Sequence, residues 1–573
     1  MILPAPSPAH PLCSRLAVDL RSLALLRAGL ALFLLIDSLS RLLHAGLLYT
    51  DDGLLPRDLA IGAIEAGRWS LHLANGGLFF AIVLSLLQVL AATALALGWR
   101  SRIAGPLLGL LLVSAIARHP AMFDASDALA LALLAFGLML PWNARWSVDA
   151  AFAPARPGPS HLSWPGIALL LFACLLPIGL ALASDAPEGL LGLLSSPSAH
   201  LPGSALVKLP SLLPTLEIGL RIAAWLILPL ALVPWARPYA RRAALVFAVL
   251  LCAFALISVA PVALALLGLL AGALLIDGAL WDRLAGDPAL PDLRVHPNGD
   301  TPGALGMALL ARELLCLQHT QVANAQDSPR ASRLLANGAS LIVIDRNEEA
   351  YLDGAAVAML LRRSPLLRPL RGLLNGGFAN SLGSLLLRLR GMAKSGRCAG
   401  HSPTDASGAT SSRIAILASV LLLLLVVVQF GAAGVLPSAL ASGARIVLRP
   451  LALDRSWIDL LPAAGAAQRW IAVPGERSNG TEVDALSESL PPPNYGLSTL
   501  PWFSGERGRQ YENALAQPGA RIERLAFARF LCEQHSEALA RVRVTLMVRE
   551  AGAQIAEQRV LLRHECRAEE SSP

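Results

Sequence analysis

Two pairs of opposite charges stand four residues apart inside apolar stretches of the sequence. Asp37 and Arg41 form one pair, and Glu217 and Arg221 form the other. Residues four apart lie on one face of a helix, so each pair can neutralise itself. Ionisable groups at membrane depth are costly and usually face a bundle interior or a cavity. The pairs therefore predict either a polar cavity, which binds a polar or acidic ligand or relays protons, or self-neutralised structural pairs.

Other ionisable residues lie near these pairs. Arg27 is near the start of the apolar stretch that contains Asp37, and we include it in the predicted cavity. His44, His72 and His119 lie near the ends of apolar stretches, but their spacing matches no metal-ligand template. The sequence also lacks a phosphate-binding loop, a dinucleotide fingerprint and a nucleophile elbow. We therefore predict no metal site and no cofactor.

The composition excludes a wholly soluble protein. Of the 573 residues, 55% are hydrophobic and 15% are charged, whereas soluble domains contain about 25% charged residues. Seven cysteines are too few for a disulfide framework. The net charge of +7 comes almost entirely from arginine, since Lys208 and Lys394 are the only lysines. The arginines lie beside apolar segments, which favours membrane topology over nucleic-acid binding, and the Arg-, Ala-, Leu- and Gly-rich composition is typical of bacteria with GC-rich genomes.

Nine stretches are apolar enough to cross a bilayer, which takes about 20 helical residues. They are 23–43, 76–98, 103–118, 127–142, 164–184, 214–235, 240–259, 262–280 and 413–436. The third and fourth are short for complete spans. The first carries Arg27 and Asp37 and has no clear cleavage site, so we expect a retained helix rather than a signal peptide. These stretches predict an all-α polytopic membrane bundle of about nine spans.

Basic residues gather in the segments on one side of these spans. The residues are Arg15, Arg21, Arg100, Arg102, Arg145, Arg156, Arg237, Arg241, Arg242, Arg388, Arg390, Lys394, Arg397 and Arg413. The alternate loops show no such excess. Because basic residues are retained in the cytoplasm, we predict a cytoplasmic N-terminus and a C-terminal domain in the periplasm or outside the cell. The predicted location is the bacterial inner (cell) membrane.

The chain divides into five predicted segments. Residues 1–285 form the bundle of about eight helices, and residues 286–400, with short apolar runs between polar stretches, form a small cytoplasmic α/β domain. Residues 401–412 are a linker, and residues 413–436 are the last transmembrane helix. Residues 437–573 form an exoplasmic α/β domain. The strand-like runs of the two polar domains include 341–344 and 544–548.

A series of short motifs occurs in order around the third and fourth apolar stretches. They are Gly98-Trp-Arg-Ser-Arg102, Ser114-Ala-Ile-Ala-Arg118-His-Pro120, Asp127, and Leu140-Pro-Trp-Asn-Ala-Arg145-Trp-Ser-Val-Asp149. The segment 49–56 and Glu217 fit the same pattern. Over about residues 20–285 the sequence resembles the HTTM domain family, bacterial relatives of the membrane part of vitamin K-dependent γ-carboxylase.

The resemblance implies a site for carboxylase chemistry that this sequence lacks. The family's catalytic base is a lysine after the fifth span, shortly before a Trp-x-x-Gly segment. Burial would lower the pKa of such an amine so that it can accept a proton. The corresponding stretch, 178–189, contains neither lysine nor tryptophan, and Lys208 lies well downstream in a proline-rich loop. We therefore expect no γ-carboxylase activity.

The predicted cytoplasmic domain resembles the DCC-type thioredoxin-like thiol–disulfide oxidoreductases. Their opening motif is Asp-Gly-Asp-Cys-x-x-Cys, and Asn298-Gly-Asp300 matches its first part. Thr301 and Ala304 stand where the two cysteines would be, and neither can exchange disulfides. Cys316 lies about three helical turns further on, and we expect it to be a buried apolar residue. The resemblance thus implies a degenerate domain without redox activity.

The C-terminal region looks like the segment that follows the last span in longer HTTM proteins. The residues that carry this likeness are Trp457, 481–484, 509–511, 530–532 and Cys566. Cys532 and Cys566 are both placed outside the membrane in this threading, where disulfides persist. They are candidates for a disulfide, and two unpaired thiols are the alternative, because sequence alone cannot bring them together.

Two functional hypotheses follow. The first is an HTTM-type membrane protein without carboxylase or redox activity, which binds a ligand or partner or assists the maturation or export of a small peptide or lipid. The second is a membrane enzyme with altered chemistry that uses Glu217 or Asp37 as acid or base. A third, an electron-transfer partner for a quinone or disulfide system, lacks a visible cofactor ligand set. The predicted partners are the bilayer and a small peptide or protein, and not nucleic acid.

Overall fold

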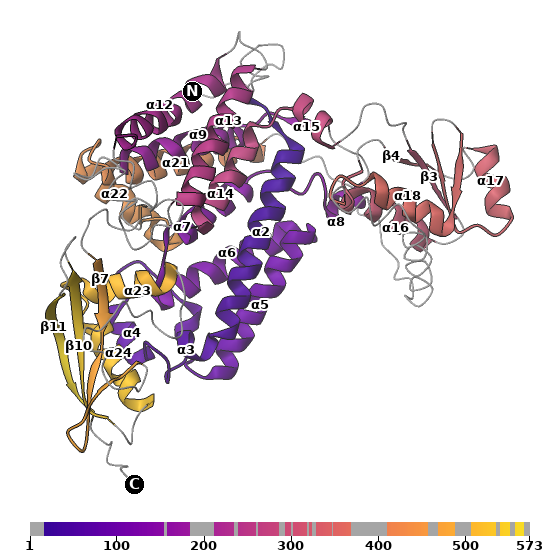
Figure 1. The fold of residues 1–573 in the computed structure, drawn as a ribbon. Coiled ribbons are helices and arrows are strands. Elements are labelled where there is room, and N and C mark those ends of the chain that lie inside the picture. Colours follow the sequence, from indigo (N-terminus) through magenta and orange to yellow (C-terminus); the bar gives the residue numbers. More distant parts are fainter. Residues whose placement is uncertain are drawn as a thin grey trace.

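The computed structural model describes most of the chain. The described residues are 16–153, 158–183, 211–233, 239–258, 262–285, 293–298, 302–317, 320–323, 328–345, 348–367, 409–456, 468–486, 506–534, 539–549 and 556–566. The architecture is mainly helical, with two mixed α/β units attached to a helical bundle (Figure 1).

Six helices among the described residues are long and apolar enough to cross a membrane. They are α2 (Leu20–Leu43), α5 (Leu78–Leu97), α6 (Ser101–Arg118), α12 (Leu213–Leu232), α13 (Tyr239–Ser258) and α21 (Ala409–Ala432). Each coincides with one predicted span. Apolar side chains such as Phe79, Leu90 and Ile103 are exposed on this bundle, as expected of surfaces that face lipid. The helices are those of a multi-pass membrane protein.

Two of the other three predicted spans are not complete straight helices in the described residues. The fourth is the short helix α7 (Ala125–Gly137). The eighth is broken: α14 (Val262–Gly272) and η3 (Ala273–Leu275) are followed by α15 (Gly278–Ala285) after a bend of 112°. The fifth coincides with α9 (Trp164–Ala183), a helix of 20 residues. In the described residues, the nine predicted spans thus correspond to six long helices, or seven with the bent pair, together with α7 and α9.

Local side-chain bonds explain these boundaries. Asp124 and Asp127 form a reciprocal capping box that fixes the start of α7, which satisfies backbone N–H groups that a continuous span would pair within the helix. Asp277 accepts the backbone N–H of Leu280 at 2.8 Å and starts α15 in a new direction. Beside the start of α15, Asp19 caps α2 by accepting the N–H of Arg21, whose side chain also donates to the carbonyl oxygen of Gly278 at 3.1 Å.

The bundle packs around α2. This helix lies against α5, α7 and α14, while α9 lies against α12 and α21. Leu26, Leu30, Leu108, Leu133 and Leu274 belong to one continuous buried core. We call the end of the bundle where α2 begins the near end and the end where α2 finishes the far end. Short elements complete the bundle: β1 (Val18–Asp19), β2 (Ser160–His161), α3 (Ala45–Tyr49), α4 (Arg57–Ala63), α8 (Val148–Ala151), η1 (Leu71–Leu73) and η2 (Pro120–Met122).

The first α/β unit stands at the near end. Its four-stranded sheet has the order β4-β3-β5-β6, in which β3 and β4 are parallel and the other pairs are antiparallel. Its elements are β3 (Leu293–Pro297), α16 (Pro302–Leu314), β4 (Thr320–Val322), α17 (Pro329–Ala336), β5 (Leu341–Ile344), β6 (Ala350–Leu352) and α18 (Asp353–Arg363). Helix α16 packs on α8 of the bundle, where Glu313 accepts the backbone N–H of Trp146 at 3.0 Å.

The C-terminal unit covers the far end. After α21 come α22 (Ser438–Leu448) and η6 (Arg449–Leu451), and then an antiparallel sheet in which β10 pairs with β7, β8 and β11, and β8 with β9. Its elements are β7 (Gln468–Ala472), β8 (Pro474–Arg477), β9 (Glu482–Asp484), α23 (Glu506–Ala516), α24 (Arg521–Gln534), β10 (Leu539–Arg549) and β11 (Glu557–Glu565). Tyr49 and Met122 of the bundle share a core with Tyr511 and Phe527, so bundle and unit pack as one body.

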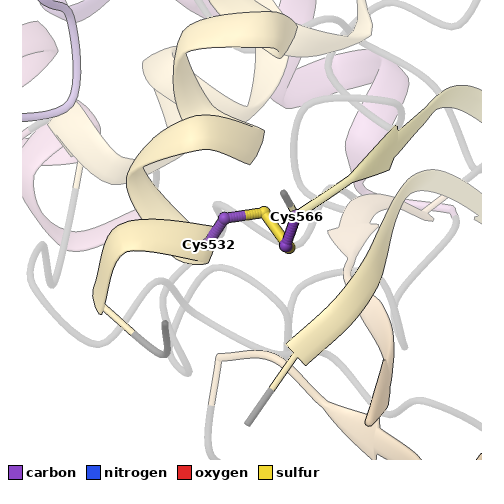
Figure 2. The surroundings of a disulfide bond; sticks show 2 residues. All are labelled: Cys532 and Cys566. Atoms are coloured by element: carbon purple, nitrogen blue, oxygen red, sulfur yellow. A yellow bond between two sulfur atoms is a disulfide. The ribbon is translucent and has the colours of Figure 1, made fainter. Parts of the chain in front are cut away.

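A disulfide closes the C-terminal unit. Figure 2 shows Cys532, near the end of α24, bonded to Cys566, the residue after β11. The two Cα atoms are 5.3 Å apart, and the bond spans 34 residues of sequence. The bond therefore ties the helix that faces the bundle to the last strand of the sheet.

Candidate functional site

The predicted cavity residues lie in three separate places. Arg27 is at the near end, the pair of Asp37 and Arg41 is at the far end, and the pair of Glu217 and Arg221 is on α12. The five residues therefore do not form one cluster, because the sequence gives their depth along each helix but not which helices pack together.

Arg27 is a structural cap at the near end. Its side chain is completely buried and donates to the carbonyl oxygens of Leu95 and Ala96, at the end of α5, and to that of Trp146 at 2.7 Å. A cation at a helix C-terminus satisfies unpaired carbonyls and favours the helix dipole. Gly98 ends α5 with φ +66°, and a Cβ there would lie 2.6 Å from Nη1 of Arg27. The glycine thus leaves room for the guanidinium, and no cavity is involved.

Glu217 and Arg221 form an i,i+4 pair on α12, as their spacing predicts. Their side chains bond to each other and are 24% and 35% exposed, respectively. Helix α12 packs against α9 and α13. In the part of the chain that the structure describes, no hydrogen bond or ion pair links them to Asp37 or Arg41. They are not part of the far-end site.

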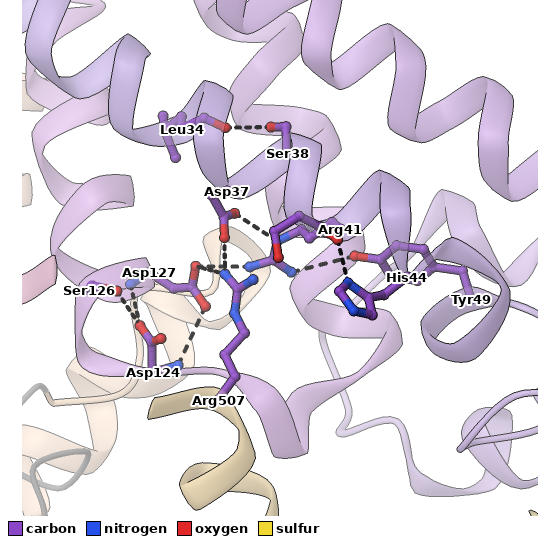
Figure 3. A network of polar contacts seen from close by, with 11 residues as sticks. Leu34, Asp37, Ser38, Arg41, His44, Tyr49, Asp124, Ser126, Asp127 and Arg507 are labelled. Atoms are coloured by element: carbon purple, nitrogen blue, oxygen red, sulfur yellow. Dashed lines mark hydrogen bonds and ion pairs between the residues drawn. The ribbon is translucent and has the colours of Figure 1, made fainter. Parts of the chain in front are cut away.

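Asp37 and Arg41 belong to a four-residue charge network at the far end (Figure 3). Arg41 donates from Nε to Asp37 at 2.7 Å and from Nη2 to Asp127 at 2.9 Å. Arg507 donates to the other oxygen of Asp37 and, at 3.4 Å, to Asp127. The side chains of Asp37, Arg41 and Asp127 are at most 7% exposed. We call these four residues the far-end network.

Three different elements bring the network together. The i,i+4 spacing on α2 places Asp37 and Arg41 side by side. The capping box holds Asp127 in the first turn of α7, since Asp124 accepts its backbone N–H at 2.9 Å. Arg507 lies in the first turn of α23, in the C-terminal unit and 470 residues from Asp37. Two guanidinium groups and two carboxylates therefore compensate each other across the boundary between bundle and C-terminal unit.

A histidine and a tyrosine extend the network along the far end. Tyr49 lies 3.5 Å from Nη1 of Arg41, and its ring centroid is 4.6 Å from that of His72. Ser114 on α6 lies 2.8 Å from Nδ1 of His72 and also accepts the backbone N–H of Leu71, at 2.7 Å. The serine thus fixes the loop that carries His72 against α6.

Arg118 and His119 lie one helical turn further along α6 and at its end. Arg118 is buried and donates from Nη2 to the carbonyl oxygens of Leu55 at 2.6 Å and Thr50 at 3.4 Å. His119 is 4% exposed and meets the ring of Tyr511 edge-on, with 5.6 Å between ring centroids. The C-terminal unit therefore covers this histidine. We call the far-end network together with Tyr49, His72, Ser114, Arg118, His119 and Tyr511 the far-end site.

Both histidines of the far-end site are held neutral. Burial, with the positive charges of Arg41 and Arg118 acting in the same direction, lowers the pKa of His72 to about 3. Burial lowers the pKa of His119 to about 3 as well, with Arg118 and Arg41 acting in the same direction. A neutral imidazole offers one N–H donor and one nitrogen acceptor. Near neutral pH, the site therefore combines uncharged histidines with charged arginines.

The near-end α/β unit carries no reactive thiol among its described residues. Thr301 lies outside the described residues, and Ala304 lies in the first turn of α16. Cys316, beyond that helix, is buried, and burial and the neighbouring Glu313 raise its pKa to about 12. Since the thiolate is the attacking species, this cysteine is suited to packing rather than to disulfide exchange.

The described residues contain no group of three or more His, Cys, Asp or Glu that could hold a metal ion. No protein-family model, curated protein or solved structure matches the chain. The chemistry of the far-end site must therefore be read from its own geometry.

Part of this site was visible in the sequence. The spacing of Asp37 and Arg41 and the places of His72 and His119 near the ends of apolar stretches singled these residues out, whereas Arg118 and Asp127 stood only in the motifs. Arg507 was missed, because it stands in a polar stretch, Gly505-Glu-Arg-Gly-Arg509, that resembles an ordinary solvated segment. No local pattern marks it, and its partner Asp37 is 470 residues away.

Proposed function

We propose that this chain is an HTTM-type multi-pass membrane protein that binds a polar ligand or a peptide at the far-end site, without carboxylase or thiol-redox chemistry. One observation carries the proposal: both oxygens of Asp37 are occupied by guanidinium groups, one from the bundle and one from the C-terminal unit. A general base needs a free oxygen within reach of its substrate. Asp37 is placed instead to dock the C-terminal unit over a buried polar site.

The ends of α2 and α21 support the proposed topology. Arg68, in the segment after α2, pairs with Asp454, beyond α21, at 3.0 Å. Trp69 donates to the carbonyl oxygen of Pro450 at 3.0 Å. Both helices thus finish at the far end and run in the same direction, which fits an odd number of crossings. We infer that the near end is cytoplasmic and that the far end lies outside the bacterial inner membrane, as the basic residues predict.

The absence of reactive groups supports the non-catalytic part of the proposal. The stretch 178–189, where the resemblance places the catalytic lysine, contains none. Thr301 and Ala304 replace the redox cysteines. The alternative, an enzyme that uses Asp37 or Glu217 as acid or base, has less support, because each carboxylate is bonded to arginine. Binding of a ligand, or assistance in the maturation or export of a peptide or lipid, does not require Asp37 or Glu217 to gain or lose a proton.

A charge-balanced double variant tests the proposal. Asp37→Asn with Arg507→Gln removes one negative and one positive charge and leaves Arg41 paired with Asp127, so no buried charge is stranded. In a strain that lacks the gene, we expect Glu217→Gln, outside the far-end site, to complement the deletion fully, and the double variant, which keeps the charge balance, to complement it at least in part. A Glu217→Gln variant that reaches the membrane at the normal level but does not complement would favour the enzyme alternative. The single Asp37→Asn variant, which leaves two arginines facing one carboxylate, is the matched control for stability.

A further inference from the structure

Arg118 is a buried cation that no carboxylate of the described residues contacts. It is 1% exposed, and its nitrogens Nε and Nη1 have no hydrogen-bond partner among those residues. Asp51 acts on it through space but is half exposed and faces Arg57, with 3.8 Å between their charged atoms. Arg41 and Arg507, by contrast, are matched by carboxylates of the far-end network. Buried charges are normally paired, because an unpaired one loses its solvation without compensation.

The histidines beside Arg118 also have unused nitrogens. In the part of the chain that the structure describes, both ring nitrogens of buried His119 lack a hydrogen-bond partner, and so does Nε2 of His72, which is 2% exposed. His119 follows Arg118 in the chain, and His72 is held by Ser114, one helical turn before Arg118. Both rings lie within the electrostatic influence of Arg118 and Arg41. Buried polar atoms in native proteins are almost always satisfied, so a group of unpaired ones indicates a bound ion or molecule.

We propose that Arg118, His119 and His72 bind an oxyanion, a carboxylate or phosphate group, in the far-end site. The inference rests on the proposed function and gives its ligand a chemical class. The Nε–H and Nη1–H groups of Arg118 are unpaired among the described residues, and each can donate a charge-assisted hydrogen bond to a carboxylate or phosphate oxygen. Each neutral imidazole adds an N–H donor. A cation or metal ion does not suit a group of unpaired donors that belong to an arginine.

Direct binding to the purified full-length protein in detergent micelles tests the proposal. The probes are inorganic phosphate, acetate and dihexanoyl phosphatidate, each compared with chloride at equal ionic strength. We expect at least one probe to raise the unfolding temperature of the unmodified protein in a saturable manner. A response to acetate indicates a carboxylate ligand, a response to inorganic phosphate a free phosphate, and a response to phosphatidate alone a lipid headgroup.

Two variants and a matched control locate the site. Arg118→Gln should weaken the binding at least tenfold, and His119→Phe, which keeps a ring against Tyr511, should weaken it severalfold even if the first variant does not fold. Arg221→Gln removes an arginine from α12, away from the far-end site, and should bind like the unmodified protein. The proposal is overturned if no probe stabilises the unmodified protein, or if the folded variants respond as it does. Asp37→Asn with Arg507→Gln leaves Arg118 in place, so complementation can fail while anion binding persists, and the two proposals fail independently.

Discussion

The two ends of helix α2 use buried arginine in opposite ways. At the near end, Arg21 pairs with Asp19 and Asp282, and Arg27 donates to backbone carbonyls at the end of α5. At the far end, Arg41 is bonded to carboxylates of two helices, and Arg507 reaches the same carboxylates from the C-terminal unit. Near-end arginines complete the bundle itself. Far-end arginines join it to another unit.

The difference extends to hydrogen bonding. Arg27 donates to carbonyl oxygens at the C-terminal end of α5, where the helix dipole is negative. Arg118, which is equally buried at the far end, bonds to carbonyls through one nitrogen only. Burial of an arginine therefore does not by itself reveal its role. What distinguishes a cap from a binding group is how many donors of the guanidinium are used: among the described residues, Arg27 leaves only Nε unpaired, whereas Arg118 leaves Nε and Nη1.

Removal of Arg27, the cap at the near end, should cause the largest loss of stability. Arg27→Met keeps the bulk but leaves carbonyls at the end of α5 without their donor. Unsatisfied buried groups and lost charged hydrogen bonds should together lower the free energy of unfolding by about 4 kcal/mol. The measurement is unfolding of the purified protein in mixed micelles. Arg221→Met, in a partly exposed pair, should cost less than about 1 kcal/mol, and equal losses for the two would refute the cap.

Loss of the disulfide should come next and should act at the far end alone. Replacement of Cys532 and Cys566 by serine removes a cross-link across 34 residues, and such a link typically contributes about 3 kcal/mol. Hydrogen exchange should therefore rise in α24 and the sheet of the C-terminal unit but not in α2 or α5. Peptide mapping under non-reducing conditions checks the bond in the natural chain. Two free thiols there would contradict it.

Removal of Arg507 should have a smaller effect, because its side chain is 20% exposed. Arg507→Gln leaves one oxygen of buried Asp37 without its donor and should lower the free energy of unfolding by about 2 kcal/mol. Proteolysis of α23 should increase while the near-end α/β unit stays protected. The added change Asp37→Asn should recover part of the loss, since contacting charges are not additive. Additive losses in the double variant would show that the two side chains do not interact.

The smallest effect concerns pH. His72 and His119 have pKa values of about 3 in the folded protein, whereas the unfolded chain titrates near 6.5. The unfolded state therefore binds more protons below pH 6.5, and stability is complete above that pH and falls as the pH decreases towards 3. At pH 5.5, each histidine should lower the free energy of unfolding by about 1.4 kcal/mol. Replacement of both by asparagine should flatten this part of the pH profile, and an unchanged profile would mean that they are not buried neutral.

Local features of the fold could be predicted from the sequence. The apolar stretches located six long helices, the run 341–344 coincides with β5, and the i,i+4 spacing paired Asp37 with Arg41 and Glu217 with Arg221. Such patterns depend on residues that are close together in the sequence, so they can be recognised without the structure. The bend after η3 was missed, because the apolar stretch continues through it and only Asp277 marks the new start.

Contacts between distant elements could not be predicted. Arg507 meets Asp37 across 470 residues, and no local periodicity records that distance. The role of Arg27 was left open between cavity and structural residue, because its partners are backbone carbonyls, which every residue possesses. The unpaired state of Arg118 and His119 is likewise a property of packing. The sequence thus indicated which residues were unusual, while tertiary structure decided what each one does.

The most direct test of the far-end site as a binding site is phosphate, acetate and phosphatidate titration of the full-length protein and of Arg118→Gln, with Arg221→Gln alongside. We predict saturable stabilisation of the unmodified protein and of the α12 control, and at least tenfold weaker binding by Arg118→Gln. Equal responses from all three proteins, or no response from the unmodified protein, would contradict the account.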